Sequence, residues 1–116
     1  MSRRDNVIRL RHMLDYTREA VALCHGKARS DLDSDRTLNL ALVRLPEIVG
    51  EAAGRVPKAE SARHPEIPWA QIVGMRNRLT HGYDWVDYDV LWQIVARDLP
   101  PLIARLEKIL SSEDAG

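Results

Sequence analysis

The residues with the clearest chemical potential stand between Arg76 and Tyr83, where the sequence reads Arg-Asn-Arg-Leu-Thr-His-Gly-Tyr. Arg76 offers a permanently charged, forked set of donors that suits phosphate oxygens. His81 can give or take a proton near neutral pH. The hydroxyl of Tyr83 can bind, donate or be modified. This combination predicts phosphodiester chemistry without a metal, although the same residues are also compatible with a polar helix end.

Metal-free cleavage of RNA uses the 2'-hydroxyl as its nucleophile, so it needs a base, an acid and a cation. His81 suits either proton transfer, and Arg76 suits the charge that builds on the phosphate. On a regular helix these two residues diverge by about 140°. They converge only if the helix ends between them, for which Gly82 is a candidate, or if a second subunit supplies the other half. Asn77 is a candidate to orient the phosphate or the imidazole, and Glu51 to hold Arg76 by an ion pair.

The composition predicts one small cytoplasmic domain. The chain has 116 residues and equal numbers of basic and acidic side chains, 17 of each. Zero net charge argues against a broad electrostatic grip on nucleic acid, while a local basic pocket remains possible. The single cysteine, Cys24, forms no internal disulfide, and no Cys/His spacing indicates a metal site. We expect no cofactor, no signal peptide and no membrane span, because no apolar run approaches about 20 residues.

Apolar residues recur at steps of three and four, which predicts an all-α fold. Asp5 is a candidate N-cap for the first helix, Asp33 or Ser34 for the second and Asp87 for the fourth. The predicted helices span residues 5–24, 34–55, 68–82 and 87–111. Pro46 is expected to kink the second of them, and Pro100-Pro101 to kink or restart the last. The result is an antiparallel bundle of four to five helices in a single domain, 1–116, with 5–110 ordered and 111–116 a flexible tail.

Several polar residues fit ordinary surface roles better than catalytic ones. His12, His25 and His64 are expected at the surface. Arg78 fits a solvated cation near a helix C-terminus.

The chain resembles the HepT-like branch of the HEPN domain superfamily over roughly residues 5–110. Its motif matches the Rx4HxY pattern through Arg76, Asn77, His81 and Tyr83. Supporting stretches are Leu-Pro-Glu-Ile-Val-Gly-Glu-Ala at 45–52, Ile-Pro-Trp at 67–69 and Leu-Pro at 99–100. Pro46 departs from the unbroken second helix that is usual in this family.

The resemblance implies a metal-independent ribonuclease that acts as a toxin in a type VII-like toxin–antitoxin pair. It implies a homodimer whose two motifs meet near the interface, with Arg76 and His81 as the catalytic pair. The implied partner is a small MNT-type nucleotidyltransferase, which silences the toxin by moving AMP from ATP onto Tyr83.

Two other interpretations remain open at this point. The bundle could be a non-catalytic binding module that engages a nucleotidyltransferase or a nucleotide, or a structural helical dimer without chemistry. The zero net charge favours the binding module over a general grip on RNA. The intact pair of Arg76 and His81 favours the nuclease.

Overall fold

The computed structural model describes residues 2–80 and 85–115, and the regular structure within these ranges is helical. Thr80 and Val86 form an isolated antiparallel bridge. The predicted all-α class is therefore confirmed. In chain order the elements are α1 (Arg3–Cys24), α2 (Asp31–Ser34), α3 (Arg36–Gly54), α4 (Lys58–Ser61), α5 (Trp69–Val73), α6 (Met75–Leu79), α7 (Tyr88–Gln93), η1 (Ile94–Asp98) and α8 (Pro100–Ala115).

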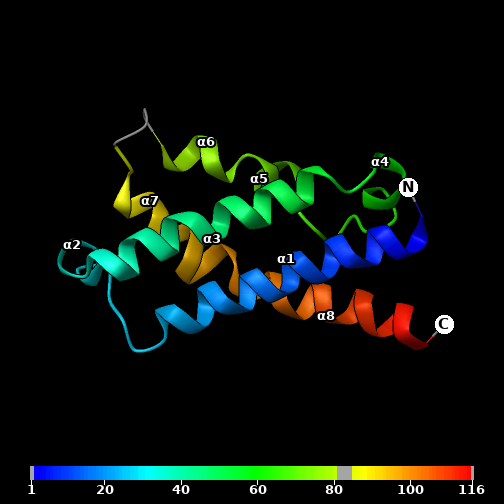
Figure 1. The fold of residues 1–116 in the computed structure, drawn as a ribbon, viewed down its shortest axis with the longest axis horizontal. Coiled ribbons are helices and arrows are strands. Elements are labelled where there is room, and N and C mark those ends of the chain that lie inside the picture. Colours follow the sequence, from blue (N-terminus) through cyan, green and yellow to red (C-terminus); the bar gives the residue numbers. More distant parts are fainter. Residues whose placement is uncertain (1, 81–84, 116) are drawn as a thin grey trace.

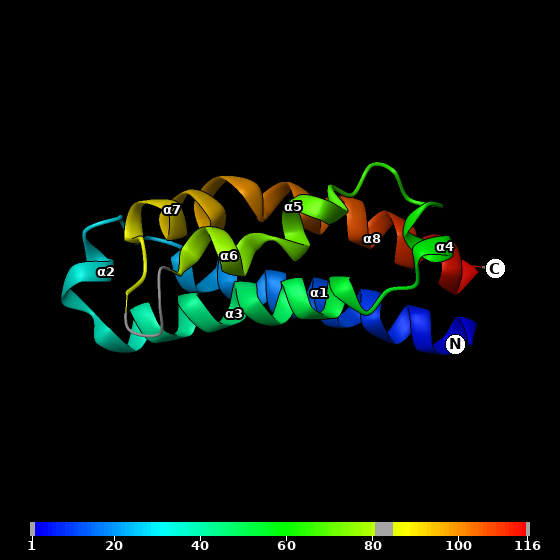
Figure 2. The ribbon, with the colours of Figure 1, turned by 90° about the horizontal axis from the view of Figure 1, so that it is seen from above.

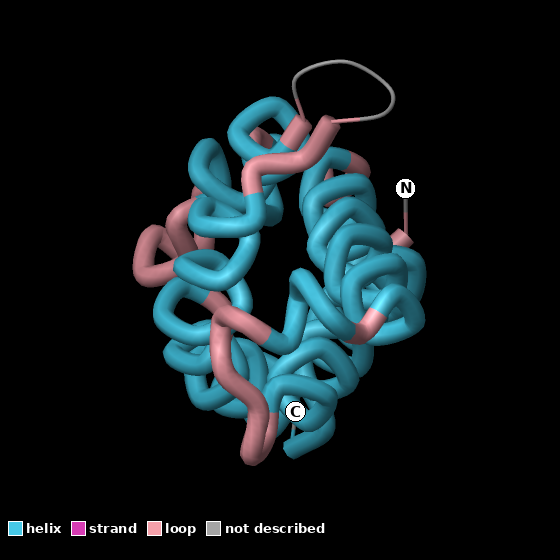
Figure 3. The backbone as a smooth tube through the Cα atoms, turned by 90° about the vertical axis from the view of Figure 1, so that its left-hand side faces the viewer, coloured by secondary structure: helices cyan, strands magenta, loops and turns pink. Residues whose placement is uncertain are grey.

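The elements form an antiparallel bundle. α1 runs away from the N-terminus, α3 returns, α5 and α6 follow the direction of α1, and α7, η1 and α8 return again (Figure 1). Seen from above, α1 and α3 form one layer, and the elements from α5 to α8 form the other (Figure 2). α1 packs along both α3 and α8, so the core lies between the layers. Viewed along the long axis, the helices surround this core (Figure 3).

Side-chain caps fix where the first long helices begin, and they differ from the predicted caps. Ser2 is the N-cap of α1: its hydroxyl accepts the N–H of Asp5 at 3.1 Å, and the Asp5 carboxylate accepts the N–H of Ser2 at 3.3 Å. This is a capping box, in which Asp5 is the third helical residue and not the cap. Asp35 caps α3 by accepting a backbone N–H at 3.0 Å. The predicted caps Asp33 and Ser34 instead belong to α2.

α3 continues through Pro46 as a single helix. A proline inside a helix costs about 3 kcal/mol, because it removes a hydrogen bond and crowds the preceding turn. The apolar stripe nevertheless stays in phase on both sides of Pro46, as predicted from the sequence. Burial of this face against the rest of the bundle offsets the cost. The buried apolar side chains of the stripe include Leu38, Leu42, Leu45, Val49 and Ala52.

The predicted third helix is interrupted and shorter than expected. α5 and α6 are separated at Gly74. α6 ends at Leu79, because Thr80 takes an extended conformation and bridges Val86. The helix therefore ends before Gly82, the predicted stop.

The last part of the chain restarts its helix, as the paired prolines predicted. Asp87 caps α7 by accepting two backbone N–H groups at 3.1 Å each. α7 passes into η1, a π turn in which the N–H of Leu99 donates to the carbonyl of Ile94 at 2.9 Å. α8 begins at Pro100 and extends to Ala115. Within the described part of the chain, no helix is long and apolar enough to cross a membrane.

A buried cluster of charges ties the N-terminal end of the bundle together. Glu60 of α4 accepts from Arg63 at 3.1 Å, pairs with Arg3 of α1, and lies 3.2 Å from Nε2 of His64. Arg3 also donates to Glu113 of α8 at 3.0 Å. His64 is only 9% exposed, so the predicted surface location is wrong. Burial lowers the pKa of His64.

Candidate functional site

A cleft of about 520 Å³ lies between α3 and the segment formed by α5 and α6. We call it the Arg76 cleft. Its lining residues are Arg44, Glu47, Gly50, Glu51, Gly54 and Arg55 from α3, with Val73 and Arg76 on the opposite side.

Gly50 determines how closely α3 and α5, the two sides of the cleft, approach each other. Gly50 lies in the middle of α3, where its missing side chain lets the α3 backbone meet the backbone of α5 at Ile72. Backbones approach this closely only where no β-carbon separates them. Because α6 follows α5 after one residue, the same contact sets the position of Arg76 relative to α3.

The end of α6 fixes the backbone of Arg76. The N–H and the hydroxyl of Thr80 each donate to the Arg76 carbonyl at 3.1 Å. Residues two apart on a helix face nearly opposite ways, so Arg78 lies away from the Arg76 cleft. Arg78 donates to Asp98 at 3.3 Å and is half-buried. The prediction that Arg78 is simply a solvated cation is wrong.

Arg76 differs from the other two arginines of the cleft in its ion pairing. Arg44 donates to Glu47 at 3.2 Å, and Arg55 donates to Glu51 at 3.3 Å. Among residues 2–80 and 85–113, no carboxylate lies within ion-pair distance of Arg76. Its exposed guanidinium can therefore hydrogen-bond a phosphate without first breaking an ion pair to one of these residues.

The two predicted supporting residues, Glu51 and Asn77, lie near Arg76, but the expected ion pair between Glu51 and Arg76 does not form. Glu51 lines the same cleft, yet its ion pair is with Arg55 and not with Arg76. Asn77 is exposed and lines a neighbouring groove together with Trp69 and Val73. Val73 lines both the groove and the cleft, so the two form adjoining surfaces.

His81 and Tyr83 lie outside the described residues. The described chain on either side of them is held together, since Thr80 bridges Val86 and the N–H of Asp87 donates to the carbonyl of Leu79 at 2.9 Å. No group of three or more His, Cys, Asp or Glu residues in the described part of the chain is placed to hold a metal ion.

Sequence reasoning missed Arg44 and Arg55, the two other cations of the cleft. Both read as ordinary surface charges of a helix. A signal was present, because residues 44, 47, 51 and 55 follow steps of three and four and so make a polar stripe along one side of α3. Only the packing of α3 against α5 shows that this stripe faces Arg76.

With this fold and cleft established, the chain can be placed: it belongs to the HepT-like family of ribonucleases in the HEPN superfamily. The family model described as "Ribonuclease HepT-like" matches residues 13–109. The resemblance noted from the motif is thereby confirmed over most of the chain.

Similar proteins agree with this assignment. "Probable ribonuclease HepT" of Thermococcus cleftensis is 38% identical over 100 residues, which cover 83% of this chain and 91% of that protein. A "Putative RNase" of Caldanaerobacter subterraneus is 34% identical over 104 residues, covering 90% and 93%. No solved structure matches the chain with significance. At the level of the family, the activity that these names support is ribonuclease activity.

Proposed function

We propose that this protein is a metal-independent RNA endonuclease, the toxin of a type VII-like toxin–antitoxin pair. The observation that carries the proposal is the exposure of Arg76 and its lack of an ion-pair partner within the described part of the chain. It is an exposed guanidinium without a carboxylate partner among the described residues, in a cleft beside two further arginines. His81 follows five residues later in the sequence and supplies the group that moves protons.

The chemistry assigns one task to each residue. His81 takes the proton of a ribose 2'-hydroxyl, and the 2'-oxygen attacks the adjacent phosphorus. The bond to the 5'-oxygen breaks, and this oxygen leaves with a proton from an imidazolium or from water. Arg76 hydrogen-bonds the phosphate oxygens as their charge increases in the transition state. The products are a 2',3'-cyclic phosphate and a free 5'-hydroxyl.

The proposed active form is a homodimer in which two motifs share one site. Support comes from the apolar surface next to the Arg76 cleft. Val73 is 48% exposed and lies where the cleft adjoins the groove lined by Trp69 and Val56. An exposed valine between two hollows gives a second copy an apolar contact beside its own catalytic residues.

The proposed partner is a nucleotidyltransferase of the MNT type that modifies Tyr83. The phenol oxygen attacks the α-phosphorus of ATP, pyrophosphate leaves, and the phenol proton passes to a base. The new phosphodiester brings a negative charge two residues from His81 in the sequence. We expect that charge to compete with the substrate phosphate for the arginines of the cleft and so to suppress cleavage.

The test is cleavage of a labelled RNA by the purified protein in EDTA, compared with His81→Ala. We expect the parent to give products ending in 2',3'-cyclic phosphate, and the variant to give none while keeping the parent's helical circular dichroism. Equal cleavage by the two proteins would refute the assignment of His81. Failure of the parent to cleave, with stable binding to the nucleotidyltransferase, would favour the non-catalytic binding module.

Modification is tested separately by incubation with the nucleotidyltransferase and ATP. We expect the mass of one AMP on Tyr83 and none on Tyr83→Phe. Unmodified Tyr83, under conditions in which the partner modifies another target, would remove this part of the proposal without affecting the nuclease.

A further inference from the structure

A groove of about 260 Å³ lies between α1 and the C-terminal end of α3. These two helices lie side by side in one layer of the bundle (Figure 2). We call it the α1 groove. Its lining residues are Asp5, Ile8, Arg9 and His12 from α1, with Ala52 and Arg55 at the end of α3. The α1 residues follow steps of three and four, so they share one face of that helix.

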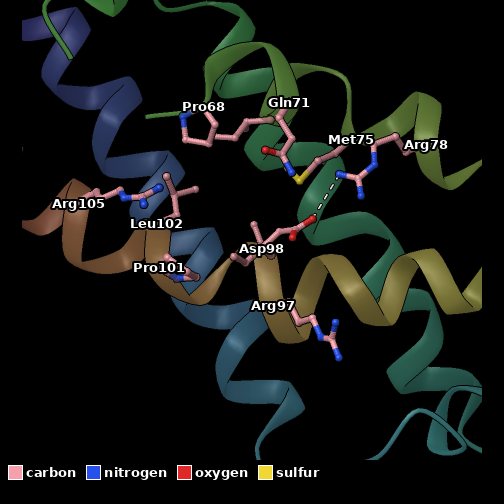
Figure 4. Close-up of a pocket in the computed structure, with 11 residues that line it drawn as sticks. Pro68, Gln71, Met75, Arg78, Arg97, Asp98, Pro101, Leu102 and Arg105 are labelled. Atoms are coloured by element: carbon pink, nitrogen blue, oxygen red, sulfur yellow. Dashed lines mark hydrogen bonds and ion pairs between the residues drawn. The ribbon is translucent and has the colours of Figure 1, made fainter. Parts of the chain in front are cut away.

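The α1 groove adjoins the Arg76 cleft. Arg55 lines both hollows, so the two surfaces meet at its side chain. That side chain is 66% exposed, and its ion pair with Glu51 is a surface pair of small stabilising effect, so a phosphate can compete for it. Arg78 does not extend the cleft, because it points across to η1, where Asp98 accepts from it (Figure 4). The cationic surface around Arg76 therefore continues through Arg55 toward α1.

Arg9 resembles Arg76 in its ion pairing. Its guanidinium donates to the backbone carbonyl of Asp5 at 3.3 Å. In the part of the chain whose side chains are described, no carboxylate lies within ion-pair distance of Arg9. The Asp5 carboxylate, which lines the same groove, accepts the N–H of Ser2 in the capping box. A phosphate can therefore accept a charge-assisted hydrogen bond from Arg9 without displacing an ion pair to one of these residues.

The α1 groove also offers surfaces for a base or a ribose. Ile8 is 40% exposed, and His12 is exposed. The imidazole of His12 makes an edge-type contact with the ring of Tyr16 on the next turn, with the ring centres 6.4 Å apart. Histidine rings are among those on which unpaired RNA bases stack. A groove that combines cations for the backbone with rings for the bases suits a single strand.

We propose that the α1 groove binds the single-stranded RNA that flanks the cleaved bond, with one phosphate at Arg9. The inference rests on the proposed function, in which the phosphate to be cleaved lies at Arg76. RNA carries a phosphate at every nucleotide, so a strand held at Arg76 presents its next phosphates to Arg55 and then to Arg9. The zero formal net charge agrees with a local track, because a few placed cations replace a broad basic face.

The test is the salt dependence of RNA binding by the full chain carrying His81→Ala, in EDTA, so that the RNA stays intact. Binding of a labelled single-stranded RNA is followed by fluorescence anisotropy at several salt concentrations. Each phosphate contact to a single strand contributes about 0.7 to the slope of the logarithm of the association constant against the logarithm of salt concentration. Arg9→Ala, added to His81→Ala, should weaken binding and reduce the slope by about 0.7. Arg9→Lys should keep the slope, because lysine keeps the charge.

Arg18→Ala, also added to His81→Ala, is the matched control. It removes the same charge from the same helix, but Arg18 pairs with Glu107 at 2.7 Å and does not line the α1 groove. Its slope should equal that of His81→Ala alone. An unchanged slope in Arg9→Ala overturns the proposal, and so does an equal decrease in Arg9→Ala and Arg18→Ala, which would indicate a general effect of charge. All variants should keep the melting temperature of His81→Ala, which separates loss of binding from loss of folding.

The α1 groove and the ribonuclease assignment fail in different ways. If the chain with His81 intact cleaves RNA while the slope does not depend on Arg9, the groove is refuted and the ribonuclease stands. If the slope depends on Arg9 while the chain does not cleave, the groove binds RNA and the ribonuclease assignment fails. Absence of RNA binding by His81→Ala at low salt refutes the groove directly.

Discussion

The α-carbon of Gly50 in α3 lies against the carbonyl of Ile72 in α5, so closely that a β-carbon on Gly50 would stand 2.8 Å from that oxygen. The neighbour is backbone and cannot rotate away, so Gly50→Ala must separate α3 from α5. Overpacking of this kind costs about 1–3 kcal/mol, and the better helix propensity of alanine returns up to about 1 kcal/mol. We expect a net loss of stability in urea unfolding, together with weaker nuclease activity because the Arg76 cleft changes shape.

Gly54, one turn further along α3, is the matched control. A β-carbon there would meet only the methyl groups of Val73, at 4.0 Å, which is ordinary contact. Gly54→Ala should therefore be neutral or slightly stabilising. If both substitutions shifted the urea midpoint alike, the close contact at Gly50 would not be what holds the two helices in place.

The role of Arg76 predicts a specific kinetic result. Arg76→Ala should lower the rate of RNA cleavage by about 10²–10³, the usual effect of removing one preorganised donor to a developing oxyanion. Arg76→Lys should recover only part of the loss, because lysine keeps the charge but not the forked geometry. The measurement is single-turnover cleavage of a labelled RNA.

Arg18 supplies the control for this experiment. It pairs with Glu107 at 2.7 Å on an exposed part of the surface, and it does not line the Arg76 cleft. Arg18→Ala removes the same charge from the protein and should cleave at nearly the parent rate. Similar losses in the two variants would mean that the total positive charge, and not the cleft, determines activity.

The proposed homodimer predicts an effect of charge at Val73. Val73→Asp places a carboxylate on the apolar surface beside the Arg76 cleft, and burying that charge against a second copy is costly. We expect a monomer in sedimentation analysis at concentrations where the parent is a dimer. Leu23→Asp is the control, because Leu23 is also exposed but lies at the far end of α1. A dimer that survives in Val73→Asp would place the interface on another surface.

The bundle was predictable because its signals are local. The in-phase stripe of α3 indicated one helix through Pro46, and Pro100-Pro101 indicated the restart that the structure contains. The break at Gly74 was not predictable, since apolar spacing continues across it and glycine is tolerated inside helices. The end of α6 at Leu79 was also not predictable, because it depends on the pairing of Thr80 with Val86. These two residues stand on opposite sides of the His81–Tyr83 part of the motif in the sequence.

Only those residues of the candidate site that belong to one continuous sequence motif were predictable. Arg76 stands out through its motif, whereas Arg55 contributes to the cleft by tertiary packing and carries no local signal of its role. The pairing of Glu51 with Arg55 shows the same limitation. A neighbour one helical turn away competes for the carboxylate, and sequence alone does not tell which cation is closer. His64 was misplaced because its charged neighbours resemble a surface loop, while its burial depends on α4 docking against the ends of α1 and α8.

The burial of His64 predicts how stability depends on pH. In the unfolded chain this imidazole takes up a proton near its ordinary pKa of about 6.5. In the folded chain burial lowers the pKa, with Arg63 and Arg3 adding to the effect while Glu66 and Glu113 oppose it. Between the two pKa values the unfolded state binds more protons than the folded state. The contribution of His64 to stability is therefore complete above about pH 6.5 and is lost as the pH falls toward the lowered value.

The measurement is the urea midpoint at several pH values between 8 and 5.5, buffered at constant ionic strength. The midpoint of the parent should fall with pH, and His64→Gln, which cannot titrate, should show a smaller fall. His25→Gln is the control, because His25 is exposed and should leave the parent's profile unchanged. A midpoint that rose on acidification in the parent alone would mean that a protonated His64 gains more from Glu60, 3.2 Å away, than it loses by burial. That result would reverse the sign of the coupling.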